Sequence, residues 1–81
     1  MRIRLVAFAG LRELLEAPER SLELPERARV DDVWRVLARE HPALDSQRAS
    51  TRVARNGRLA SFEDELVEGD ELALLPPVGG G

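Results

Sequence analysis

The two most apolar strand-like segments of this chain lie near its opposite ends, and this placement limits the fold more than any other feature. Residues 2–8, RIRLVAF, alternate with the period of two that is typical of a strand with one buried and one wetter face. Residues 71–75, ELALL, form the last apolar run of the chain. Both segments are apolar enough for the centre of a sheet, so we expect them to be parallel neighbours.

Two segments between these strands have helical spacing. Residues 31–41, DDVWRVLAREH, predict the main helix, with Asp31 as its N-cap and two acidic residues at the positive end of its dipole. Residues 11–17, LRELLEA, predict a short helix that ends at Pro18. Residues 43–50 are polar, and we expect them to form a turn.

The other strands are shorter. Residues 21–25, SLELP, alternate again and are expected to pair with the first strand. Residues 51–61 read as two strands joined by Asn56-Gly57, a pair that favours a two-residue turn with positive φ at both positions. A second turn region follows, with Gly69 at its tight point.

This order of elements predicts a single α+β domain, because 81 residues leave no room for two cores. One main helix and a short second helix against a mixed five-stranded sheet is the economical packing. With the first and last strands parallel at the centre, the architecture is a β-grasp, ubiquitin-like fold. We expect the domain to span residues 1–75 and a flexible C-terminal Gly-Gly tail to span residues 76–81.

The apolar stripe of the main helix consists of Val33, Trp34, Val36 and Leu37. Trp34 has two interpretations. It could offer a platform for a ligand, but a tryptophan in such a stripe more often covers one edge of a core.

If the helix covers the sheet face that carries Ile3, Leu5, Leu72 and Leu74, no second element remains to cover the other face. That face carries Val6, Phe8 and Leu75. Leu59 could join them, although the pattern alone does not decide which way it faces. An uncovered apolar patch of this kind, rimmed by arginines, predicts a partner-binding surface.

Composition excludes several classes of function. The net charge of −3 with interspersed charges argues against binding to nucleic acid or to an anionic membrane. The chain has no cysteine and one histidine, so we expect no metal site. We find no secretory signal and no apolar run of about 20 residues that could span a membrane, which predicts a cytoplasmic protein. All twelve basic residues are arginines, so lysine-linked chains of this protein with itself are excluded.

The last residues, PPVGGG, are suited to entering a narrow channel. Glycine lacks a Cβ atom, and the extended segment 76–81 can reach about 20 Å. Pro76 and Pro77 fix φ in advance, which lowers the entropy lost on ordering the segment. A frayed terminus or part of a tag is the alternative explanation.

The chain resembles the sulfur-carrier small subunits of molybdopterin synthase along essentially its whole length. The most specific segments are FAGLREL at 8–14, NGRLAS at 56–61, EGDELALLPPV at 68–78 and the final Gly80-Gly81. Two departures are mild: members of that family commonly have threonine or serine where this chain has Gly79, and often an aromatic residue where it has Leu75.

The resemblance implies a covalent co-substrate, without catalytic residues or a bound cofactor of its own. An adenylating, E1-like activating enzyme would use ATP to adenylate the carboxylate of Gly81, and a sulfur donor would convert it to a thiocarboxylate. The large synthase subunit, in a heterotetramer, would receive the tail, and sulfur would pass to cyclic pyranopterin monophosphate. Pro76, Pro77, Val78, Gly79 and Gly80 would insert with Gly81, while Phe8, Leu59 and Leu75 would contact partners.

Three alternatives remain open at this point. The same thiocarboxylate chemistry could serve thiamine or cysteine biosynthesis, although the proline pair and FAGLREL favour molybdopterin. The protein could be a ubiquitin-like modifier that is joined to lysines of other proteins through Gly81. It could also be a plain binding module with an inert tail.

Overall fold

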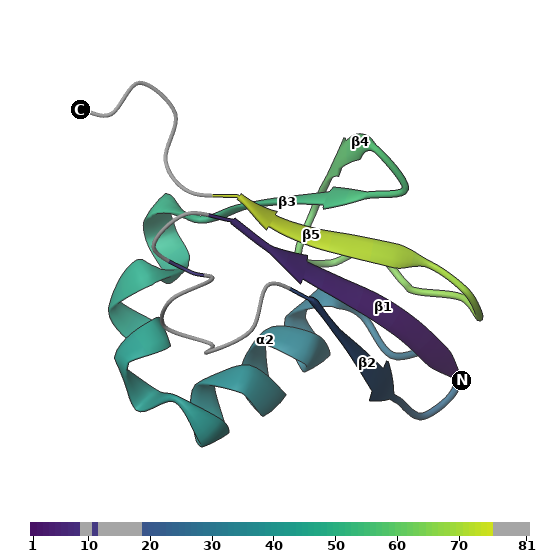
Figure 1. Cartoon of the computed structure of the whole chain (residues 1–81), viewed down its shortest axis with the longest axis horizontal. Coiled ribbons are helices and arrows are strands. Elements are labelled where there is room, and N and C mark those ends of the chain that lie inside the picture. The colour runs from purple at the N-terminus through teal and green to yellow at the C-terminus, as the bar shows by residue number, and fades with distance from the viewer. Residues whose placement is uncertain (9–10, 12–18, 76–81) are drawn as a thin grey trace.

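The computed structural model describes residues 1–8, 11 and 19–75, which form a five-stranded sheet packed against helices (Figure 1). The predicted short helix falls mostly outside these residues, and so does the segment 76–81. The elements are β1 (Arg2–Ala7), β2 (Glu19–Glu23), α2 (Val30–Glu40), the 3₁₀ helix η1 (Pro42–Ser50), β3 (Arg52–Arg55), β4 (Arg58–Ala60) and β5 (Glu71–Leu75).

The first and last strands are parallel neighbours at the centre of the sheet, as the sequence predicts. The strand order is β2-β1-β5-β3-β4, with Leu5 of β1 in register with Leu72 of β5. The other three pairings are antiparallel, including the predicted pairing of β1 with β2. The β-grasp, ubiquitin-like architecture is confirmed, and the sheet is mixed.

Helix α2 crosses one face of the sheet (Figure 1), and the hydrophobic core lies between the helix and the sheet. Its residues Val33, Trp34 and Leu37 are buried, as predicted for the apolar stripe, whereas Val36 is half-buried. The strands contribute the facing side chains Ile3, Leu5, Ala7, Leu22, Val53, Leu72 and Leu74, all of them buried. The core is therefore almost entirely aliphatic, with Trp34 as its one buried aromatic residue in the described part of the chain.

The start of α2 differs from the prediction. The helix begins at Val30 and its N-cap is Arg29, so Asp31 lies inside the first turn instead of capping the helix. The capping bond comes from Asp32, whose Oδ2 accepts a hydrogen bond of 2.8 Å from the backbone N–H of Arg29. Asp31 instead pairs with Arg35, at 3.0 Å, and with Arg48. Both carboxylates still lie where the helix dipole favours negative charge.

The expectation of a turn at 43–50 was wrong, because these residues belong to η1. Leu44, the one large aliphatic side chain of this segment, is fully buried. Side-chain hydroxyls bond back to carbonyls of the preceding turn: Ser46 to Ala43, Ser50 to Gln47, and Thr51 to Gln47. A single anchor gives no repeating apolar stripe, and such local bonds are also typical of turns, which is why the sequence pattern did not predict a helix.

Trp34 covers an edge of the core, as one of its two interpretations predicts. Its ring meets Phe62 edge to face, with the centroids 5.8 Å apart. The guanidinium of Arg48 lies over the ring of Phe62, 4.0 Å from its centroid. Only 2% of Trp34 is exposed, which is too little for a surface platform.

The Asn56-Gly57 turn joins β3 to β4 with φ of 51° and 83°, as predicted. The Asn56 side chain also fixes the start of β5. Its Nδ2 donates to the buried carboxylate of Asp70 at 2.8 Å, and its Oδ1 accepts from the backbone N–H of Glu71 at 2.9 Å. Gly69, with φ of 84°, closes the preceding turn.

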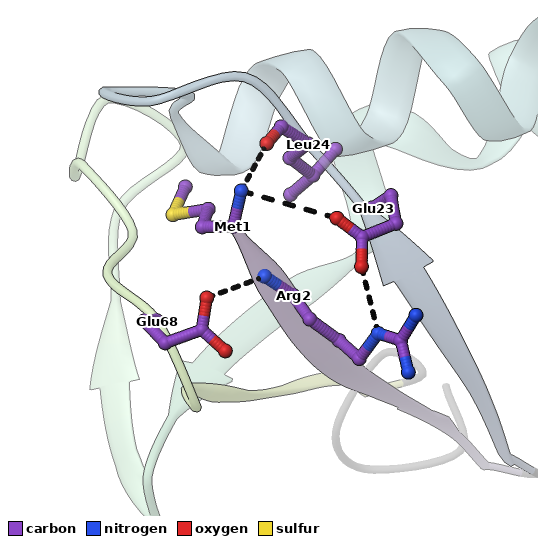
Figure 2. A network of polar contacts seen from close by, with 5 residues as sticks. All are labelled: Met1, Arg2, Glu23, Leu24 and Glu68. Atoms are coloured by element: carbon purple, nitrogen blue, oxygen red, sulfur yellow. Dashed lines mark hydrogen bonds and ion pairs between the residues drawn. The ribbon is translucent and has the colours of Figure 1, made fainter.

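The start of β1 is held on both sides by polar contacts (Figure 2). The amine of Met1 donates to the carbonyl of Leu24 at 2.6 Å, and the N–H of Leu24 donates back to Met1 at 2.7 Å. Arg2 binds Glu23 through its side chain, at 2.8 Å, and Glu68 through its backbone N–H, at 2.9 Å. These contacts tie β1 to β2 and to the turn before β5.

Within the residues that the structure describes, we find no helix that is long and apolar enough to cross a membrane.

Candidate docking surface

The face of the sheet opposite α2 has no covering element among the residues described (Figure 1). The predicted division of the strand side chains between the two faces of the sheet is confirmed. Buried under the helix are Ile3, Leu5, Leu72 and Leu74. On the other face, Phe8 is 45% exposed, and Val6 and Leu75 are half-buried without an element above them.

A row of apolar side chains crosses this open face. Strand register places Leu59 opposite Ala54, Ala54 opposite Ala73, and Ala73 opposite Val6. Directly opposed residues in a sheet point to the same face, so the structure settles the facing of Leu59. Its side chain is 72% exposed, the largest exposure of any large apolar residue described.

A second row lies next to the first, at the end of β5. Leu75 is opposite Arg52 of β3, and the backbone N–H of Phe8 continues the sheet by donating to the carbonyl of Leu74 at 3.3 Å. The two rows together form what we call the open-face patch, and its members are Val6, Phe8, Ala54, Leu59, Ala73 and Leu75. Such a contiguous apolar surface indicates a contact site for another protein.

The part of the open face formed by β2 and the first half of β1 is polar and internally neutralised. Arg2 lies 2.8 Å from Glu23, and Arg4 pairs with Glu71 and, at 3.6 Å, with Glu19. The hydrogen bond to Glu71, with the negative charge of Glu19 beside it, raises the pKa of Arg4 above its ordinary value. This half of the face therefore offers few free charges, and the apolar half is the better docking surface.

Leu75 is both the last residue of β5 and a member of the open-face patch. The structure thus brings Phe8, Leu59 and Leu75 to one face, as the predicted contact residues require. The other predicted site residues, Pro76, Pro77, Val78, Gly79, Gly80 and Gly81, lie outside the described residues.

Sequence reasoning missed Ala54, Ala73 and Arg52 as neighbours of this surface. The signal that could have found them is the Asn56-Gly57 turn, because a two-residue turn fixes which residues of β3 and β4 are opposite each other. The pairing of β3 with β5 has no such local marker, so only the structure shows that Arg52 lies beside Leu75.

Comparison with known proteins identifies the family. The sequence pattern of the ThiS family matches residues 5–81. The chain belongs to that family. A molybdopterin synthase sulfur carrier subunit of Chlamydomonas reinhardtii is 35% identical to this ThiS family member over the full length of both chains. The resemblance drawn from the sequence is confirmed.

Two solved structures are similar to this ThiS family protein over nearly their whole length. A putative molybdopterin converting factor, subunit 1, from Pyrococcus furiosus is 31% identical, with a TM-score of 0.86, over 96% of this chain and 99% of the other. The crystal structure of SAMP1 from Haloferax volcanii is 32% identical, with a TM-score of 0.85, over 100% of both chains.

Proposed function

We propose that this protein is a sulfur carrier of molybdopterin synthesis and that Gly81 is its working residue. The observation that carries the proposal is the open-face patch at the root of the PPVGGG segment, in a chain that aligns end to end with a sulfur carrier subunit. The patch supplies a surface for docking outside a partner, and the glycines supply a segment slim enough to enter it.

The proposed chemistry uses the terminal carboxylate, which is a poor electrophile until it is activated. A carboxylate oxygen of Gly81 attacks the α-phosphorus of ATP on an activating enzyme, and pyrophosphate leaves. Sulfide released by a sulfur donor then attacks the acyl carbon, AMP leaves, and a thiocarboxylate remains. The chain contains no cysteine that could hold a persulfide, so the acyl group is the place for sulfur on this protein.

The proposed acceptor is cyclic pyranopterin monophosphate, bound in the large subunit of molybdopterin synthase. That partner supplies the catalytic groups, and the present chain acts as co-substrate and small subunit. A solved protein–protein complex of subunits 1 and 2 of molybdopterin-converting factor from Helicobacter pylori contains a chain of this fold and supports such a pairing. We place these encounters in the cytoplasm, where ATP-dependent activation would occur.

Reconstitution with the large subunit of the same organism tests the pathway. Thiocarboxylated protein, the large subunit and cyclic pyranopterin monophosphate should give molybdopterin, measured as its fluorescent oxidation product. The variant Phe8→Arg should keep its fold yet give much less product at low protein concentration, because its charge lies in the open-face patch. No product from the wild-type protein, with a competent large subunit, contradicts the assignment to this pathway.

A second candidate function is protein modification, favoured by the similarity to a small archaeal modifier protein in both sequence and structure. Small archaeal modifier protein 1 of Haloferax volcanii is 35% identical over 91% of this chain and 94% of its own length.

Expression in the native host separates the two functions. A modifier gives adducts of high mass whose linkage peptides contain Gly81, whereas a sulfur carrier gives the free chain with sulfur in place of one oxygen. A carrier for thiamine or cysteine synthesis would load with sulfur but give no molybdopterin.

A further inference from the structure

The arginines of the sheet fall into two groups according to their ion pairs. Arg2, Arg4 and Arg20, on β1 and β2, each have a glutamate partner, respectively Glu23, Glu71 with Glu19, and Glu40. Arg52 and Arg58, on β3 and β4, have no carboxylate within ion-pair distance in the described part of the chain. Both of these side chains lie at exposed positions.

Positive charge is also concentrated around these two strands. Residues 46–62 contain four arginines and no acidic residue, although the whole chain carries a net charge of −3. Two of the four are used inside the fold, since Arg48 pairs with Asp31 and Arg55 lies 2.9 Å from Asp70. The charge left for an outside partner is that of Arg52 and Arg58.

Strand register separates these two arginines, and Arg52 is the one that borders the open-face patch, directly opposite Leu75. Arg58 is opposite Arg55, and Arg55 is opposite the buried Leu72, so Arg58 points to the helix-covered side of the sheet. Hollows of about 520 Å³ and about 400 Å³ flank β4; Arg52 lines the larger, Arg58 lines the smaller, and Leu59 lines both.

Each hollow also has one acidic residue on its wall. Glu63 lines the larger hollow and Asp64 the smaller. The carboxylate of Asp64 is engaged by the backbone N–H of Ser61 at 3.1 Å. Neither acidic residue reaches ion-pair distance of an arginine among the residues described, so neither neutralises Arg52 or Arg58.

We infer that the partner surface covering the open-face patch carries a carboxylate that pairs with Arg52. The inference rests on the proposed docking at this patch. A partner that covers Leu59 and Leu75 removes water from the neighbouring guanidinium group of Arg52, and a buried charge without a counter-ion is strongly unfavourable. A paired carboxylate removes that penalty, speeds the encounter and fixes the orientation of the complex. The apolar patch beside Arg52 favours an acidic protein surface over a nucleic acid.

The experiment measures binding of the intact chain to the large subunit of molybdopterin synthase from the same organism, at several NaCl concentrations. The variant Arg52→Glu should bind at least about tenfold more weakly at low salt, mainly through slower association, and with a flatter salt dependence. The control Arg39→Glu makes the same charge change on α2, on the covered side of the sheet. It should change the affinity by no more than about twofold.

A neutral change guards against a folding defect. Arg52→Gln should weaken binding to an intermediate degree, while circular dichroism and the melting temperature stay those of the wild type. Arg52→Glu protein that binds as tightly as Arg39→Glu, with the same salt dependence, overturns the inference and leaves the proposed function standing. Wild-type protein that fails to bind the large subunit at all contradicts both.

Discussion

At the scale of single residues, two leucines show that the burial of a side chain, and not its residue type, decides whether it stabilises the core or is available at the surface. Leu44 is fully buried within η1, whereas Leu59 is 72% exposed on β4. Both are apolar residues in polar stretches of sequence, so sequence alone ranks them alike. In the structure, one anchors a helix and the other lies in the open-face patch.

We expect Leu44→Ala to lower the free energy of unfolding by about 2–5 kcal/mol, because it leaves a cavity in a close-packed core. Leu59→Ala makes the same chemical change at the surface and should alter stability by less than about 0.5 kcal/mol. Urea denaturation followed by circular dichroism measures both values. Equal losses of stability in the two variants contradict the assignment of Leu59 to the open face.

At the scale of elements, the outer strand β2 is joined to α2 by a bidentate ion pair. Arg20 is in register with Leu5 and so lies on the helix-covered face. Its guanidinium donates to both oxygens of Glu40, at 2.6 and 3.0 Å. The hydrogen bond from Arg20 lowers the pKa of Glu40 below its ordinary value of 4.5.

This pair predicts a pH-dependent contribution to stability. Because the pKa of Glu40 is lower in the folded state, its contribution is present above pH 4.5 and is lost as the pH falls through the folded-state pKa. Both side chains are partly exposed and screened by solvent, so Glu40→Gln should cost only about 0.5 kcal/mol at pH 7. The stability difference between wild type and variant, measured by urea denaturation, should shrink as the pH falls below 4.5 and vanish once Glu40 is protonated in the folded state. A difference that does not depend on pH contradicts an electrostatic origin.

The elements with a strong local signal were predictable from sequence, and those that depend on tertiary contacts were not. Alternation gave the faces of β1 and β5, and Asn56-Gly57 gave the hairpin, because each pattern is determined by neighbouring residues. The 3₁₀ helix at 42–50 depends on one buried leucine. The true start of α2 depends on a backbone bond from Arg29 that a sequence pattern does not reveal.

The candidate site shows the same division. The exposure of Phe8 and Leu75 on the open face could be predicted from strand alternation. The facing of Leu59 required the register between β3 and β4, and Arg52 entered the surface only through pairing of β3 with β5. Long-range register is therefore the part of the site that sequence reasoning could not supply.

At the scale of the whole molecule, the proposed function separates docking from chemistry. The domain presents the open-face patch on the side of the sheet away from α2, and the sequence beyond Leu75 carries the proposed reactive group. The buried core residues that the structure describes lie between Ile3 and Leu74. We therefore predict that changes to Gly81 affect sulfur loading without lowering stability.

Intact mass spectrometry tests the central claim most directly. The chain is incubated with ATP, the activating enzyme and a sulfur source, and a variant lacking Gly81 is treated in parallel. We predict that the wild-type mass rises by the difference between one sulfur and one oxygen atom, while the shortened variant stays unchanged at an unaltered melting temperature. A wild-type mass that does not change with an enzyme proven active, or a shortened variant that loads equally well, contradicts the account.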